Sequence, residues 1–261
     1  FCLSRGLGDV YKRQDIIKRI QEISGEKNFQ MNLSVIELNQ FYGIEIDDFA
    51  CEIAKLSLWL AEHQMNCKFR EEIGEPKPTL PLGESGHIVC GNALRMDWEE
   101  VCPKYIEKTT LAHEVNRADL RNTPLKLDLP KEEAEVYVLG NPPYKGFKYQ
   151  TDLMKSDIEY VFSKFKTYKK LDYIACWFYL AAIYIRNTTF RYAFVSTNSV
   201  TQGEQLSLLW PYIFNMNLEI CFAYTSFKWS NNAKYNANVI CVIIGAVSYT
   251  HLRAHETGRN L

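Results

Sequence analysis

Val136-Tyr137-Val138-Leu139-Gly140-Asn141-Pro142-Pro143-Tyr144 is a short apolar run that leads directly into a polar turn. The apolar residues predict a buried strand, and the two prolines fix the backbone that follows it. Ligands of doubly wound sheets bind at the carboxyl ends of the strands, so this turn is a candidate site. The alternative is a rigid turn without a functional role.

The residue types of Asn141, Pro142, Pro143 and Tyr144 suit the binding of a planar amine. The exocyclic amine of a nucleobase is a poor nucleophile because its lone pair is delocalised into the ring. The Asn141 side-chain oxygen and the Pro142 carbonyl can accept hydrogen bonds from that amine and turn its lone pair toward a methyl group. Tyr144 can stack on a base that has left the double helix.

The remaining sequence alternates apolar strands with amphipathic helices. Strands are predicted at residues 41–46, 87–90, 136–139, 192–196, 218–225 and 237–245. Helices are predicted at residues 15–24, 47–66, 171–187 and 203–215, with a helical or irregular segment at 97–121. We expect the 47–66 helix to pack through a core stripe of Phe49, Ile53, Leu56 and Leu60. This order predicts an α/β fold with a parallel sheet covered on both faces.

Two further polar residues follow predicted strands. Glu45 can accept hydrogen bonds from both ribose hydroxyls of an adenosine-containing cofactor, or it is a capping charge before the next helix. Asn92 can recognise the amine edge of the cofactor adenine, or it is an ordinary turn asparagine.

Two segments combine basic and aromatic residues, which can meet phosphates and stack on bases. Residues 145–170 contain seven lysines and three acidic residues, and residues 227–234 precede the last strand. The candidates for DNA contact are Lys145, Lys148, Lys228 and Lys234. The candidates for a second wall of a base pocket, opposite Tyr144, are Phe227 and Trp229. The alternatives are a solvated face above core aromatics and a polar hairpin loop.

The bulk composition is that of a soluble globular protein, with 261 residues, 47% hydrophobic residues and a formal net charge of −1. Any affinity for nucleic acid must therefore come from local basic patches. Eight cysteines without C-x-x-C pairs predict buried free thiols in a reducing cytosol and no metal site. Apolar runs fall short of the roughly 18 residues that a membrane span needs, which excludes a membrane protein.

The sequence resembles the amino-methyltransferase family of DNA methylases, and most of all the large single-chain restriction-modification enzymes of the MmeI-like kind. The resemblance covers roughly residues 15–246. The residues that carry it are Phe41-Tyr42-Gly43-Ile44-Glu45-Ile46, Ala61-Glu62-His63-Gln64-Met65-Asn66, Cys90-Gly91-Asn92-Ala93-Leu94-Arg95, Gly140-Asn141-Pro142-Pro143-Tyr144 and Phe194-Val195-Ser196-Thr197-Asn198-Ser199-Val200-Thr201-Gln202-Gly203-Glu204-Gln205.

The resemblance implies a Rossmann-like S-adenosylmethionine-dependent methyltransferase sheet with a reversed hairpin at one edge. It implies that Glu45 binds the cofactor ribose and that Ile46, Asn92 and Ala93 flank the cofactor adenine. It also implies that residues 141–144 hold a flipped adenine of double-stranded DNA in a prokaryotic cytoplasm.

The two ends of the chain depart from this pattern. Residues 1–14 and 247–261 look like translated adapter sequence, or else they are disordered native tails. Residues 15–246 are then a partial catalytic domain, incomplete at its N-terminus. We expect a glycine-rich cofactor loop, a target-recognition domain and, where one is fused, a nuclease to be missing, and the chain alone to be inactive.

Two other functions fit the same residues. One is methylation of another planar amine, in a protein glutamine or an RNA guanine. The other is a catalytically inert DNA-binding or specificity module that retains the fold.

Overall fold

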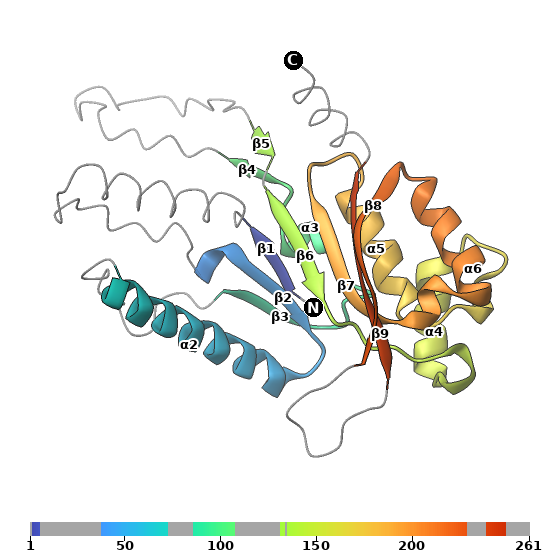
Figure 1. Ribbon diagram of the computed structural model, residues 1–261, viewed down its shortest axis with the longest axis horizontal. Helices are drawn as coiled ribbons and strands as arrows, with labels where there is room; N and C mark the ends of the chain where they lie inside the picture. The colour runs from blue at the N-terminus through green and yellow to red at the C-terminus, as the bar shows by residue number, and fades with distance from the viewer. Residues whose placement is uncertain are drawn as a thin grey trace, which may run out of the picture.

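A mixed sheet of seven strands forms the centre of the computed structural model, which describes residues 2–5, 38–72, 86–107, 131–133, 135–228 and 239–248 (Figure 1). The strands in spatial order are β3 (His87–Cys90), β2 (Phe41–Glu45), β1 (Cys2–Arg5), β6 (Val136–Gly140), β7 (Arg191–Thr197), β9 (Ile240–Ser248) and β8 (Leu218–Lys228). A separate pair consists of β4 (Tyr105–Glu107) and β5 (Lys131–Glu133).

Four strands run in the same direction and end at the same edge of the sheet. β2 pairs in parallel with β3, and β6 pairs in parallel with β7. β1 lies antiparallel to both β2 and β6, so β2 and β6 also share a direction. β9 runs antiparallel to β7 and pairs with β8 in a hairpin at the edge, as the resemblance implies. We call the shared carboxyl ends of β2, β3, β6 and β7 the site edge.

The position of β1 differs from the expectation, which placed residues 1–14 outside the fold. Cys2 pairs with Gly43 and Leu139, and Arg5 pairs with Val136. An extended segment is favourable here because β2 and β6 would otherwise leave unpaired backbone groups facing each other. Since β1 is antiparallel, Arg5 lies away from the site edge. That residues 1–14 are non-native stays a prediction.

The helices are α2 (Asp48–Glu72), α3 (Trp98–Val101), α4 (Asp152–Phe162), α5 (Ala175–Ile185) and α6 (Gly203–Phe214). Short 3-10 turns are η1 (Leu38–Gln40), η2 (Phe147–Tyr149), η3 (Tyr168–Lys170) and η4 (Asn198–Thr201). The predicted helix at 15–24 lies outside the described residues. The 97–121 segment begins with α3 and β4, and its part beyond residue 107 also lies outside them.

Helix α5 is the centre of the core. The Phe178 ring packs edge-on against Phe194 of β7 at a centroid distance of 5.3 Å and against Trp210 of α6 at 5.7 Å. Figure 1 shows α5 beside β7, with α4 and α6 next to it. A helix enclosed in this way has apolar residues on nearly all sides, which explains its sequence.

The expectation for the packing face of α2 is wrong. Phe49, Ile53, Leu56 and Leu60 are 45–74% exposed, whereas Cys51 is buried. Ala54, Ser57 and Leu58 of α2 instead line a cavity of about 300 Å³ against β2 and β3. Apolar residues occur on both faces of this helix, so periodicity alone does not identify the face that packs.

The cysteines of the described residues are free thiols, as predicted. Cys51, Cys102, Cys176 and Cys241 are buried, but Cys90 and Cys221 are exposed. In the described ranges no helix has the length and apolar character needed to cross a membrane.

The enclosed position of Phe178 predicts a large loss of stability on truncation. We expect Phe178→Ala to lower the free energy of unfolding by about 3–5 kcal/mol, because it leaves a cavity beside the rings of Tyr192, Phe194 and Trp210. Ile183→Ala on the same helix, where the side chain is 44% exposed, should cost about 1 kcal/mol or less. Urea unfolding of both variants measures the difference, and equal losses would contradict this account of the core.

Candidate active site

The Asn141–Tyr144 turn begins directly at the carboxyl end of β6, on the site edge. Asn141 and Pro143 are exposed, Pro142 is buried, and Tyr144 is partly buried. The turn is therefore anchored through Pro142 and Tyr144, while the Asn141 side chain is accessible from solvent.

The Tyr144 hydroxyl lies beside Asn141 and beside Cys241 of β9. Burial raises the pKa of Tyr144, the nearby Cys241 thiol raises it further, and a hydrogen bond from the Asn141 side chain lowers it. Phe227 stands directly opposite Cys241 in the pairing of β8 with β9, so the two side chains share a face of the sheet. The structure thus brings the predicted aromatic residues Tyr144 and Phe227 to the same cysteine. Trp229 lies outside the described residues.

Asp172 and Tyr173 fix the segment that follows the turn. The Asp172 carboxylate accepts hydrogen bonds from the Phe147 amide at 3.2 Å and from the Ser199 hydroxyl at 2.8 Å. The Tyr173 amide donates to the Lys145 carbonyl at 2.9 Å. Asp172 is buried, so its two hydrogen bonds replace water and hold this segment against the end of β7.

The run after β7 has a structural role that sequence reasoning did not identify. Besides Ser199, the buried Gln205 side chain accepts from the Asp172 amide at 2.9 Å and donates to the Lys170 carbonyl at 2.7 Å. These contacts join the N-terminal turn of α6 to the segment before α5. Ser199 and Gln205, two of the residues by which the sequence resembles the MmeI-like enzymes, therefore help to hold Asp172 and with it the segment after the Asn141 turn.

The four predicted cofactor residues lie together at the ends of β2 and β3. The Gly91 amide donates to the Glu45 carbonyl at 2.7 Å, which joins the two strand ends. The Glu45 carboxylate accepts from the Ile46 amide at 2.8 Å. The side chain of Ile46 is exposed and Ala93 is buried. Asp47, rather than Glu45, caps the first turn of α2 by accepting from the Ala50 amide at 2.9 Å.

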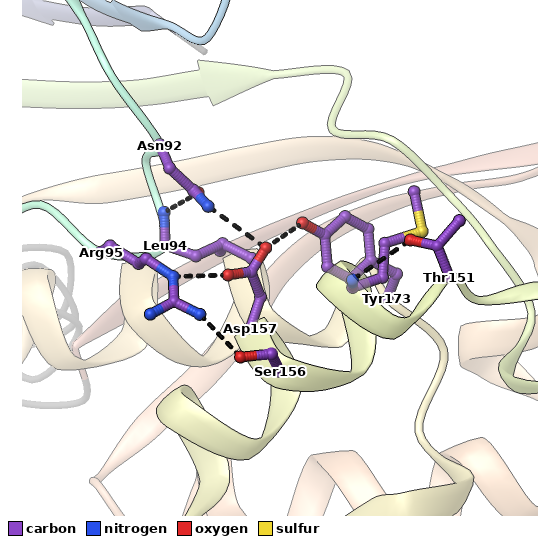
Figure 2. Close-up of polar contacts among 8 residues, drawn as sticks. Asn92, Leu94, Arg95, Thr151, Ser156, Asp157 and Tyr173 are labelled. Carbon is purple, nitrogen blue, oxygen red and sulfur yellow. Dashed lines mark hydrogen bonds and ion pairs between the residues drawn. The ribbon is translucent and has the colours of Figure 1, made fainter.

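Asn92 is part of a hydrogen-bond network centred on Asp157 of α4 (Figure 2). Its side-chain oxygen accepts from the Leu94 amide at 2.9 Å, and its nitrogen donates to Asp157 at 3.2 Å. The same carboxylate accepts from Arg95 Nε at 2.7 Å and from the Tyr173 hydroxyl at 2.8 Å. Sequence reasoning missed both α4 and Asp157.

A signal for α4 was present in the sequence. Thr151 caps the helix by accepting a hydrogen bond from the Met154 amide at 3.3 Å. Ile158 and Phe162 then recur at helical spacing, and both are buried. An acid adjacent to them, Asp157, is the kind of residue that is buried only when it has partners.

The lysines differ in their surroundings. Lys145 and Lys148 are exposed beside the turn, and Lys228 is exposed at the end of β8. Lys155 pairs with Asp152 at 3.2 Å. Lys234 lies outside the described residues.

Lysines also line a cleft of about 310 Å³ between η3 and α6. Its lining residues are Lys166, Thr167, Lys169, Lys170, Glu204, Ser207 and Leu208. Neither this cleft nor the cavity under α2 includes Asn141. Across the part of the chain that the structure describes, no group of His, Cys, Asp or Glu side chains is placed to hold a metal ion.

The mixed sheet and the accessible Asn-Pro-Pro-Tyr turn at its edge define a methyltransferase-type α/β domain. The family model for the MmeI DNA-methyltransferase domain matches residues 11–257. The chain therefore belongs to this family.

Known proteins are similar over most of this chain. DNA methyltransferase A of Bacillus subtilis (strain 168) is 49% identical over 232 residues, which are 88% of this chain and 23% of that protein. A solved structure of the Type IIL restriction-modification enzyme MmeI in complex with DNA has 37% sequence identity and a TM-score of 0.67. It covers 90% of this chain and 29% of the MmeI chain. The present chain thus spans about a quarter of the length of these relatives.

The role of Asp172 predicts a local effect on backbone protection. In Asp172→Ala, the Phe147 amide loses its acceptor, so its hydrogen exchange should accelerate at least about tenfold. Hydrogen exchange measured by NMR or mass spectrometry detects this change.

Asp152→Ala is a suitable control, because it removes an exposed carboxylate that pairs with Lys155 and does not contact Phe147. Unchanged exchange at Phe147 in the Asp172→Ala variant would show that the segment is held by other contacts.

Proposed function

We propose that this chain is the catalytic core of an enzyme that transfers a methyl group from S-adenosylmethionine to the exocyclic amine of adenine in DNA. The enzyme acts in a restriction-modification or phage-defence system. The observation that carries the proposal is the accessible Asn141 at the end of β6, beside Tyr144. Phe227 is paired with Cys241, the cysteine that Tyr144 also approaches. The proposal includes a Rossmann-like character for the sheet, supported by the common direction of β2, β3, β6 and β7.

The turn is suited to hold the target amine. The Asn141 side chain donates a hydrogen bond to Tyr144, and its amide oxygen can accept hydrogen bonds from a ligand. That oxygen and the Pro142 carbonyl accept the two amine hydrogens of a flipped adenine, which directs its lone pair out of the ring plane. Both acceptors stabilise the positive charge that develops on the nitrogen, and the fixed backbone supplies them already oriented. The adenine ring stacks on Tyr144, with Phe227 as the second wall.

The ends of β2 and β3 fit the adenosine part of the cofactor. Glu45 accepts hydrogen bonds from the ribose hydroxyls, and Ile46 offers an exposed apolar side chain for one face of the adenine. Asn92 reads the amine edge and Ala93 flanks the ring. When bound, the cofactor supplies an electrophilic methyl group on a positively charged sulfur.

DNA phosphates meet the lysines beside the turn. Lys145 follows Tyr144 directly, Lys148 lies nearby in the sequence, and Lys228 follows Phe227, so both walls of the proposed base pocket carry an adjacent cation. These charges are local, which suits a chain with a net charge of −1. The partner proposed is double-stranded DNA with a flipped adenine, in a prokaryotic cytoplasm.

The complete activity requires more protein than this chain. The relatives are about four times longer, and one of them is a restriction-modification enzyme solved with DNA. We propose that a glycine-rich cofactor loop, a target-recognition domain and, where one is fused, a nuclease belong to the full-length protein, and that residues 1–261 alone do not methylate.

The proposal predicts a loss of catalysis without a loss of fold when Asn141 is truncated. In the full-length protein, Asn141→Ala should lower kcat for DNA methylation by about 100- to 1,000-fold, the usual cost of removing one preorganised polar group from a transition state. The melting temperature and the affinity for S-adenosylhomocysteine should not change, because Asn141 is exposed and is not among the residues proposed to bind the cofactor.

The matched control is Asn215→Ala, which removes an exposed asparagine at the end of α6. Methylation that persists in the Asn141→Ala variant would exclude the assigned role of the turn.

The basic residues predict a change in the salt dependence of DNA binding. In the full-length protein, the double variant Lys145→Gln/Lys148→Gln should weaken binding for all DNA sequences alike. The slope of log affinity against log salt should become less steep by about 1.8, because each phosphate that a lysine no longer neutralises changes it by about 0.9. Lys155→Gln is the control, since this lysine pairs with Asp152. An unchanged slope in the double variant would remove these two lysines from the interface.

A further inference from the structure

The proposed function assigns no role to the buried carboxylate of Asp157. Asp157 is 6% exposed and accepts hydrogen bonds from three side chains, Asn92, Arg95 and Tyr173. Figure 2 shows Asn92 and Arg95 reaching it from the segment after β3, and Tyr173 reaching it from another part of the chain. A buried carboxylate with this many donors is fully satisfied and rigid.

The network holds both ends of the Asn92 side chain. The Leu94 amide donates to its oxygen at 2.9 Å, and its nitrogen donates to Asp157 at 3.2 Å. A rotation of the amide by half a turn would bring its oxygen against the Asp157 carboxylate and its NH2 group against the Leu94 N–H. Both new contacts would be repulsive, so the orientation of the amide is fixed.

Asn92 still has unused hydrogen-bonding capacity. An amide oxygen can accept two hydrogen bonds and an amide NH2 can donate two, and the network uses one of each. One acceptor position and one donor remain on the same side chain, the pair that an asparagine uses to bind the amine edge of adenine. If the base carried a carbonyl in place of that amine, its oxygen would face the Asn92 side-chain oxygen, and the two would repel each other.

We infer that Asp157 is a positioning residue that sets the orientation of the Asn92 amide and thereby makes the cofactor site selective for adenine over hypoxanthine. The inference rests on the proposed function, because it takes Asn92 as the residue that reads the cofactor base.

Tyr173 connects this selectivity to the target side of the active site. Its hydroxyl donates to Asp157 at 2.8 Å, while its backbone amide donates to the Lys145 carbonyl, one residue after the Asn141–Tyr144 turn. Burial and the adjacent Asp157 raise the pKa of Tyr173 well above its usual value, so the hydroxyl remains a donor. Tyr173 therefore contacts both Asp157 and the segment that follows the Asn141–Tyr144 turn.

The test compares two ligands in the full-length protein by calorimetry. S-adenosylhomocysteine carries the adenine amine, and S-inosylhomocysteine carries an oxygen in its place. The wild-type protein should bind the adenosyl ligand at least about tenfold more tightly, because only the base with an amine can form both hydrogen bonds with the Asn92 amide. Asp157→Leu removes the acceptor that fixes the Asn92 NH2 group, so this ratio of affinities should fall by about tenfold.

Two further variants make the result interpretable. Ser156→Ala removes only the 3.0 Å hydrogen bond between Arg95 and Ser156 and should leave the ratio unchanged. If Asp157→Leu is unstable because Arg95 loses its counter-charge, the double variant Arg95→Met/Asp157→Leu removes the unpaired cation and should show the same fall in the ratio.

An equal weakening of both ligands, or an unchanged ratio, would mean that Asp157 has only a structural role and would overturn the inference. It would leave the proposed function intact. A wild-type protein that binds neither ligand would instead contradict the proposed function itself.

Discussion

The hydrogen bonds that Asp172 and Tyr173 make to residues 145–147 are the constraint on which the candidate site depends. They fix the chain just after the Asn141–Tyr144 turn. The Tyr173 amide donates to the Lys145 carbonyl at 2.9 Å, and the Phe147 amide donates to the Asp172 carboxylate at 3.2 Å. The turn itself cannot be held by strand pairing, because it begins where β6 ends. Without these contacts the side-chain oxygen of Asn141 would have no fixed direction, and a preorganised acceptor would be lost.

The shared direction of β2, β3, β6 and β7 brings the residues of the candidate site together. It places Glu45, Asn92 and Asn141 along one edge of the sheet, although almost 100 residues separate the first from the last. The network around Asp157 then links the Asn92 side of that edge to the Asn141 side through Tyr173. The proposed cofactor and target sites therefore share one rigid support, formed by α4 and the start of α5.

Much of the sheet was predictable, because strands such as His87–Cys90 and Val136–Gly140 are short apolar runs bounded by polar turns. The turn at Asn141 was predictable because its residue types are unusual and chemically specific. The packing face of α2 was not, since apolar residues occur all around it. The partners of Asp157, Asp172 and Gln205 come from segments distant in sequence, and no local pattern indicates which donors a buried acid will meet. The direction of β1 could not be predicted either, because a parallel and an antiparallel strand would both satisfy the unpaired backbone groups of β2 and β6.

The proposed role of the Asn141–Tyr144 turn is to hold an adenine amine for methylation. The most direct measurement is to incubate DNA with the full-length protein and isotopically labelled S-adenosylmethionine, and then to analyse the digested nucleosides by mass spectrometry. The account predicts labelled N6-methyladenine. Label found only in cytosine, in RNA or in protein, or no label at all from a folded protein that binds the cofactor, would contradict it.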